Sequence, residues 1–297
     1  MPEQRLAGCG TALVTPFTGA GQVDERALRA LVDWQIAEGT HFLVPCGSTG
    51  EAATLTPAEH RRVVEIVAEQ TAGRVPVMAG AGANDTARAI ALSKEMRAAG
   101  ASHLLHVSPM YNKPPQRGIE AHFRAVAAAV ELPIVVYNVP GRTASNMEAA
   151  TTLRLAEVEN IVGVKEASGS LAQIDEIIRN RPDDFAVLAG DDAITLAVVA
   201  HGGDGVISVV SNVTPRLMAG LVDAALAGDF AAARAAYARL APWMSAAFVE
   251  SNPAPVKAAL AMLGRAENVL RLPLVPLAAA HEPAVRAALT HAGALPS

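Results

Sequence analysis

A lysine ends one of the most apolar stretches of the chain. In IVGVKEASG, residues 161–169, Lys165 follows small and branched apolar side chains, although the chain has only four lysines against twenty arginines. Burying an ammonium group without a partner costs several kcal/mol, so we expect Lys165 to have a lowered pKa and to be partly neutral. A neutral amine is a nucleophile. The alternative is a structural ion pair with Glu166 or another carboxylate.

Two of the three tyrosines stand at comparable places. Tyr137 ends the apolar run in VVYNVPGRTA, and Tyr111 follows the preceding run in SPMYNKPP. Phenols beside a strand-end amine can pass protons to and from a carbonyl addition. The alternative for Tyr137 is ordinary core packing with a satisfied hydroxyl.

Hydroxyl groups and an arginine that also follow the ends of apolar runs could bind carboxylates. CGSTGE places Ser48 and Thr49 between two glycines, so that two hydroxyls and free backbone N–H groups follow an apolar run. Arg142 in NVPGRTA offers a bidentate fork for a second carboxylate. The alternatives are a glycine-rich turn with a helix cap and a surface salt bridge.

Other polar residues give weaker signals. Asp191 and Asp192 could bind a divalent ion, but no histidine or second carboxylate cluster is spaced to complete a site, so helix capping is the better interpretation. Cys46 has no marked histidine and asparagine partners and is expected to be a buried, inert thiol. The sequence therefore implies no metal.

The elements that must position these residues follow a regular rhythm. Eight apolar runs start near residues 10, 41, 75, 103, 132, 161, 185 and 205, and amphipathic helical patterns fill nearly every interval. Continuous apolar strands indicate a sheet covered on both faces, so we predict a (β/α)8 TIM barrel, with a doubly wound sheet as the alternative. We expect the barrel with its catalytic site in residues 1–224 and a C-terminal helical region in residues 225–297.

Composition excludes several classes of function. The chain has 297 residues, 51% of them hydrophobic, and a formal net charge of -5 without a basic run, which argues against nucleic acid as a partner. No stretch approaches the length of a membrane-spanning helix, and the N-terminus lacks a signal-type apolar region. With only two cysteines, we expect a cytoplasmic protein without disulfides.

Taken together, these stretches resemble the dihydrodipicolinate synthase and N-acetylneuraminate lyase family of Schiff-base aldolases. The resemblance extends over nearly the whole chain, through GTALVTPF, GSTGEAATL, YNKP, YNVPGRT, GVKEASG, AGDD, GGDGVISV, NPAPVK and LRLPLVPL. An ordered series of this kind is far more specific than any single motif.

The resemblance implies a role for each candidate. Lys165 matches the lysine that forms an imine with pyruvate, and Tyr137 matches the proton donor and acceptor. Ser48 and Tyr111 match the hydroxyls of a proton relay, Tyr111 being lent across a subunit interface of a homotetramer. Arg142 matches the arginine that binds the carboxylate of the aldehyde. The positions that match pyruvate-binding residues are Thr49, Ile207 (through its backbone) and Gly190.

The implied reaction is the condensation of pyruvate with L-aspartate semialdehyde and ring closure, in lysine and diaminopimelate biosynthesis, without metal or organic cofactor. Three alternatives stay open: a paralogue acting on a 2-keto-3-deoxy sugar acid, a metal-dependent aldolase, and a barrel that only binds ligands. Two departures concern regulation, because Pro57 replaces a histidine and Arg88 replaces a glutamate of lysine-inhibited synthases. We therefore expect weak or absent inhibition by lysine.

Overall fold

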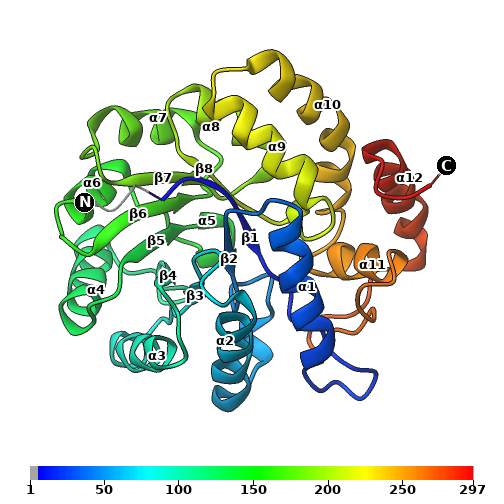
Figure 1. Ribbon diagram of the computed structural model, residues 1–297. Helices are drawn as coiled ribbons and strands as arrows, with labels where there is room; N and C mark the ends of the chain where they lie inside the picture. Colours follow the sequence, from blue (N-terminus) through cyan, green and yellow to red (C-terminus); the bar gives the residue numbers. More distant parts are fainter. Residues whose placement is uncertain (1–5, 297) are drawn as a thin grey trace.

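The computed structural model describes residues 6–296, in which parallel strands alternate with helices around a central barrel (Figure 1). The strands are β1 (Gly8–Ala12), β2 (Phe42–Val44), β3 (Met78–Gly80), β4 (His103–Val107), β5 (Ile134–Asn138), β6 (Ile161–Glu166), β7 (Ala186–Ala189) and β8 (Gly205–Ser208). The helices are α1 (Glu25–Ala37), α2 (Pro57–Thr71), α3 (Thr86–Ala98), α4 (Gln116–Ala129), α5 (Pro140–Thr143), α6 (Ala149–Ala156), α7 (Leu171–Asn180), α8 (Thr195–Ala200), α9 (Pro215–Leu226), α10 (Phe230–Ala246), α11 (Ala254–Met262) and α12 (Glu282–Ala292).

The sheet closes into a barrel. Its strands follow the order β2-β1-β8-β7-β6-β5-β4-β3. The two end strands meet through a parallel bridge between Leu43 and Val77 and through a hydrogen bond of 2.9 Å from the Gly80 N–H to the Pro45 carbonyl. The predicted (β/α)8 barrel is therefore confirmed, and the doubly wound alternative is wrong.

Strand residues divide between the interior of the barrel and the helices outside. One buried cluster fills the interior and includes Phe42, Val44, Met78, Leu105, Val135, Tyr137, Leu188 and Ile207. The alternate residues pack outward against the helices, as in β5, where Ile134 and Val136 belong to the larger outer cluster. Burial on both faces explains why these strands are continuously apolar in sequence.

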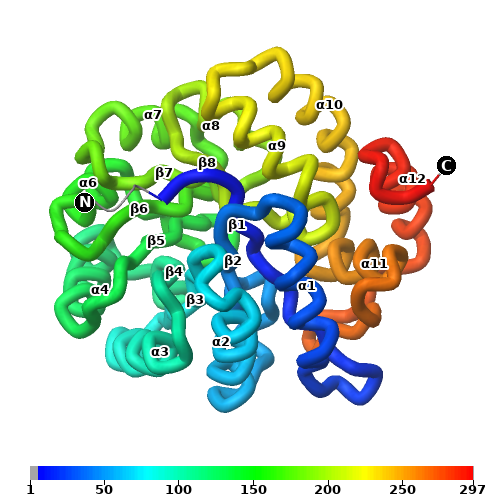
Figure 2. Tube along the Cα trace, in the orientation of Figure 1, coloured from blue at the N-terminus to red at the C-terminus, as the bar shows by residue number. Residues whose placement is uncertain are grey.

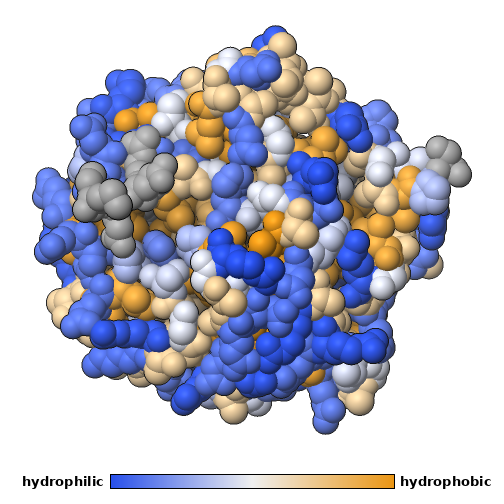
Figure 3. Space-filling model, viewed as in Figure 1, coloured by the Kyte–Doolittle hydropathy of each residue, from blue (hydrophilic) through white to orange (hydrophobic). Residues whose placement is uncertain are grey.

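Several of the outer helices begin at polar capping residues. Thr56 and Glu59 form a capping box at the start of α2, and Asp24 and Asp85 cap α1 and α3 through their side chains. Figure 3 shows hydrophilic residues over α1 and α2, whereas the surface over the alanine-rich α10 is paler and more apolar. No helix within residues 6–296 has the length and apolar character needed to cross a membrane.

The C-terminal helices attach beside the barrel. Trp243 of α10 is fully buried and donates its indole N–H to the Val210 carbonyl at 3.3 Å. After α11 the chain passes back beside α1, where Arg271 reaches the Gly21 carbonyl, before it turns to α12 (Figure 2). The expected boundary after residue 224 falls near the end of α9, and the division into two regions stays a prediction.

Candidate active site

Lys165 and Tyr137 lie side by side at the ends of β6 and β5. They are paired in register across the two parallel strands, one residue before each strand ends. The Lys165 Nζ lies 4.3 Å from the centroid of the Tyr137 ring. Both side chains are buried, with 5% and 7% of their residues' surface exposed. The predicted amine and phenol are therefore neighbours at the carboxyl end of the barrel, where TIM-barrel enzymes carry out their chemistry.

Burial controls the protonation of both groups. Desolvation lowers the pKa of Lys165 to about 8, with the Asp192 carboxylate opposing this shift and the Arg142 guanidinium adding to it. Desolvation raises the pKa of Tyr137 to about 12, although Arg142 acts in the opposite direction. Near neutral pH the lysine is thus partly a free amine, while the phenol keeps its proton and can donate it.

The ion pair between Lys165 and Glu166 that the sequence left open does not form. Because successive strand residues point to opposite faces, Glu166 turns toward the outer helices. It accepts hydrogen bonds from Asn138 Nδ2 at 3.0 Å, Gln173 Nε2 at 3.0 Å and the Ser168 N–H at 2.6 Å. These bonds tie the end of β6 to β5 and α7, so Glu166 stabilises the strand end rather than neutralising the amine.

Gly190 leaves room for the lysine side chain. A Cβ atom at this position would lie 2.6 Å from the Ala167 Cβ and 3.1 Å from the Lys165 Cε. The Gly190 N–H donates to the Glu166 carbonyl at 2.7 Å, which fixes the approach of the two segments. Ile207 is fully buried on β8 and belongs to the same interior cluster as Tyr137.

The two hydroxyls of the GSTGE turn have different environments. Ser48 is exposed, whereas Thr49 is only 4% exposed. The Thr49 Oγ1 accepts a hydrogen bond of 2.8 Å from the Nδ2 of Asn252, which lies 203 residues later. Sequence reasoning missed Asn252 as part of this site, since a contact between segments so far apart leaves no local pattern. Its place in the NPAPVK stretch was the one available signal.

Arg142 and Tyr111 are both at the surface of the single chain. Arg142 lies in α5, is exposed, and has no ion pair with a carboxylate of residues 6–296, so the salt-bridge alternative finds no support in that range. Tyr111 is 87% exposed and has a positive φ of 75°. Among the described residues no hydrogen bond joins Tyr111 to Ser48 or Tyr137, so one chain does not assemble the expected relay by itself.

The remaining candidates have structural roles. Asp191 caps the short 3-10 helix Asp192–Ile194, as expected, by accepting from the Ala193 N–H. Asp192 instead accepts from the N–H groups of Val209 and Val210, after β8, at 3.0 and 3.1 Å. Cys46 is buried, and desolvation raises the pKa of its thiol far above the ordinary value. Within residues 6–296 no group of three or more histidine, cysteine, aspartate or glutamate side chains could hold a metal ion.

The chain is similar to known proteins over nearly its whole length. The sequence model of the dihydrodipicolinate synthetase family matches residues 5–292. A 4-hydroxy-tetrahydrodipicolinate synthase of Koribacter versatilis is 54% identical over 92% of this chain and 91% of its own length. Dihydrodipicolinate synthase from Aquifex aeolicus has a TM-score of 0.94 and 43% identity, covering 96% and 97% of the two chains. The chloride-inhibited dihydrodipicolinate synthase from Acinetobacter baumannii, complexed with pyruvate, has a TM-score of 0.96 and 41% identity over 97% of this chain and 99% of its own.

Proposed function

The chain belongs to the dihydrodipicolinate synthetase family and is a lyase with the 4-hydroxy-tetrahydrodipicolinate synthase activity of its relatives, and we propose that it acts through an imine between Lys165 and pyruvate. The reaction joins pyruvate to L-aspartate semialdehyde in lysine and diaminopimelate biosynthesis. The observation that carries the proposal is the buried Lys165 amine, with a pKa of about 8, beside the Tyr137 ring.

The first half of the reaction makes a nucleophile from pyruvate. The neutral Lys165 amine attacks the keto carbon, and the resulting carbinolamine loses its hydroxyl group as water. Tyr137 stays protonated at neutral pH because its pKa is about 12, so it is suited to donate the proton that this water needs. The protonated imine then withdraws electrons from the methyl carbon. Tyr137, left as a phenolate by the first transfer, takes a proton from that carbon, and the imine becomes an enamine.

The second half forms the carbon–carbon bond. The enamine carbon attacks the aldehyde of the semialdehyde, whose carboxylate Arg142 binds at the rim of the barrel. The amine of the product then displaces the Lys165 nitrogen as the ring closes, which regenerates the free lysine. Arg142 is exposed and has no partner carboxylate in residues 6–296, so it remains available for the carboxylate of the aldehyde. This favours L-aspartate semialdehyde over the sugar-acid substrates of a paralogue.

The other predicted residues bind pyruvate or move protons. We assign the pyruvate carboxylate to the Thr49 hydroxyl and the backbone of Ile207, with Gly190 keeping the space beside Lys165 open. The relay from Tyr137 through Ser48 ends at the partner subunit's Tyr111 in a homotetramer. The 87% exposure of Tyr111 in the single chain supports this assignment, because the side chain is free to enter a second copy.

Borohydride trapping tests the nucleophile with an internal control. Lys257 is a second buried lysine with a pKa of about 8, but its amine is held by Glu51 and by the Val269 carbonyl. Reduction in the presence of pyruvate should place the adduct on Lys165 and leave Lys257 unmodified. An adduct on Lys257, or trapping that persists in Lys165→Ala, would show that the nucleophile is assigned wrongly.

Coupled turnover tests the aldehyde partner. Pyruvate and L-aspartate semialdehyde should give turnover in the presence of a chelator, and Arg142→Ala should raise the KM for the semialdehyde far more than the KM for pyruvate. Arg142→Lys keeps the charge but loses the bidentate fork, and it should fall between the two. Trapping of pyruvate without turnover of the semialdehyde would instead favour the sugar-acid paralogue, and loss of turnover with chelator would favour a metal-dependent aldolase.

A further inference from the structure

Three residues of the C-terminal region hold the segment that carries Thr49. Asn252 donates to the Thr49 Oγ1, and Lys257 forms an ion pair with Glu51, both side chains of this pair being fully buried. The Arg271 N–H donates to Glu51 at 3.1 Å. The segment is thus held at Thr49 and at Glu51 by residues from outside the barrel.

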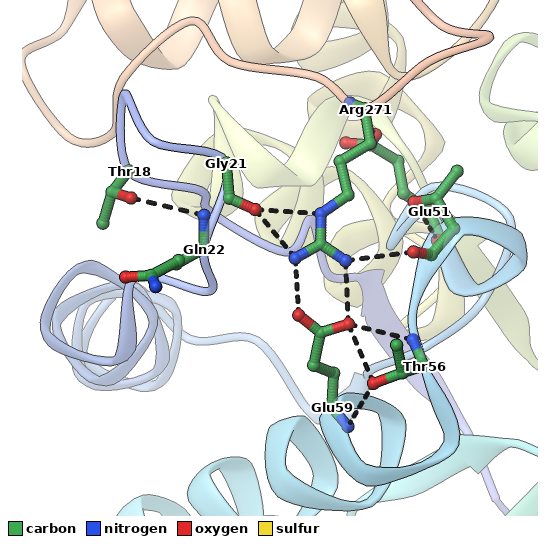
Figure 4. A network of polar contacts seen from close by, with 8 residues as sticks. Thr18, Gly21, Gln22, Glu51, Thr56, Glu59 and Arg271 are labelled. Carbon is green, nitrogen blue, oxygen red and sulfur yellow. Dashed lines mark hydrogen bonds and ion pairs between the residues drawn. The ribbon is translucent and has the colours of Figure 1, made fainter.

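The Arg271 side chain extends the same attachment. Figure 4 shows its guanidinium between the Gly21 carbonyl and Glu59, the residue that closes the capping box of α2. Arg271 Nη2 lies 2.6 Å from Glu59 Oε1, and a second nitrogen donates to the Thr54 carbonyl at 3.0 Å. The turn between β2 and α2 therefore has little freedom, so the direction of the Thr49 hydroxyl is set by its immediate partner.

That partner determines which way the Thr49 proton points. A hydroxyl has one proton to donate and lone pairs that accept. Because the Asn252 amide donates to Oγ1, the proton of Thr49 is not used in this contact, and within residues 6–296 Thr49 Oγ1 donates no hydrogen bond of its own. Both residues are about 95% buried, so bulk water does not compete freely for the hydroxyl. The Thr49 hydroxyl can therefore donate its proton to a ligand, and an ionised carboxylate needs such a donor because it only accepts hydrogen bonds.

We propose that Asn252 is a positioning residue that sets the Thr49 hydroxyl as a proton donor to the carboxylate of the keto acid. This inference rests on the proposed function, in which Thr49 binds pyruvate. Asn252 itself acts through Thr49. An acceptor in place of the amide would capture the Thr49 proton and reverse the polarity of the site.

Asn252→Asp tests the direction of the hydrogen bond. The substitution keeps the shape of the side chain, but above its pKa the introduced carboxylate accepts the Thr49 proton and adds a charge that repels pyruvate. At about pH 8 we expect the apparent dissociation constant of pyruvate, measured by borohydride trapping, to rise roughly tenfold or more. Asn252→Ala should cause a smaller rise, of about threefold. A purely structural role predicts the reverse order, because the isosteric variant preserves packing.

A double-mutant cycle that combines Asn252→Asp with Thr49→Val tests whether Asn252 affects pyruvate binding through the Thr49 hydroxyl. In the Thr49→Val background, Asn252→Asp should weaken pyruvate binding much less than it does in the wild type. Equal effects in both backgrounds would overturn the proposal, as would the order Asn252→Ala worse than Asn252→Asp. Unfolding midpoints at one protein concentration identify variants that do not fold, and if Asn252→Asp is among them, Asn252→Ala is carried through the same cycle.

The outcome for the wild-type protein separates this inference from the proposed function. If the wild type traps pyruvate on Lys165 and the Asn252 variants bind pyruvate normally, the positioning role alone is wrong. If the wild type traps no pyruvate, the proposed imine and the role of Asn252 fail together. Turnover of the semialdehyde is not needed for either conclusion, since trapping reports the first substrate alone.

Discussion

Lys165→Met and Lys257→Met should change the free energy of unfolding in opposite directions. Lys165 and Lys257 are both buried, and desolvation lowers the pKa of each to about 8. Lys257 faces the Glu51 carboxylate, which is fully buried with it, whereas Glu166 beside Lys165 is turned away to Asn138 and Gln173. Methionine keeps most of the apolar stem of lysine and removes the charge.

The magnitude for Lys165 follows from its shifted pKa. A fall from 10.5 to about 8 means that the folded state at neutral pH disfavours the charged amine by roughly 3 kcal/mol relative to the unfolded chain. This penalty is complete below the folded-state pKa and disappears above the unfolded-state value. Lys165→Met should therefore stabilise the protein by up to about 3 kcal/mol at pH 7, and the gain should vanish as the pH rises above about 10.

The same change at position 257 leaves a carboxylate without its partner. The amine of Lys257 has the same lowered pKa, but its removal also leaves the Glu51 carboxylate buried without a partner. The net cost of removing one member of a buried ion pair is typically about 3–5 kcal/mol, so Lys257→Met should be strongly destabilising. The Val269 carbonyl also loses its donor. Adding Glu51→Gln should restore much of the loss, because the amide oxygen can still accept from the Arg271 N–H without carrying a charge.

Equilibrium urea unfolding measures all of these variants. Protein concentration must be the same throughout, since association of subunits would change the apparent midpoint. A Lys165→Met variant less stable than the wild type at pH 7, or a Lys257→Met variant of unchanged stability, would refute the reasoning from burial and pairing.

Three further predictions concern activity and regulation. The rate of pyruvate trapping on Lys165 should rise roughly fiftyfold between about pH 6 and 8 and then level off, and a rise centred near the ordinary lysine pKa would contradict this. Gly190→Ala should lower kcat about tenfold or more, because its Cβ would lie 3.1 Å from the Lys165 Cε, whereas Gly220→Ala, with no atom within 4 Å, should match the wild type. Since we expect Pro57 and the exposed Arg88 to disfavour lysine binding, turnover should persist in millimolar lysine, and clear inhibition below that range would disprove the expectation.

The barrel was accessible from sequence because its signals are local. Each strand is a short apolar run bounded by turn residues, and each helix between strands has its own apolar face. Strand ends also marked Tyr137 and Lys165, whose neighbouring places follow from the parallel register of β5 and β6. A polar residue that ends a buried strand must lie at the active end of such a barrel.

The residues that hold the site in place, Asn252 and Lys257, could not be predicted from local sequence patterns. Asn252 meets Thr49, and Lys257 meets Glu51, only because the C-terminal helices pack beside the second βα turn. Nothing in the residues near Thr49 indicates which distant side chain will donate to its hydroxyl. Long-range polar contacts of this kind depend on the packing of whole helices, which local periodicity does not determine.

The two lysines also show why a lowered pKa does not by itself identify a nucleophile. Both amines are desolvated to a pKa of about 8, so both are partly neutral near physiological pH. Lys257 already donates to a carboxylate and a carbonyl and lies against the Phe17 ring, with none of its surface exposed. Lys165 keeps its nitrogen available beside a phenol and has a glycine where a side chain would block its stem. Desolvation supplies reactivity in both places, and only the arrangement around Lys165 leaves that reactivity open to a substrate.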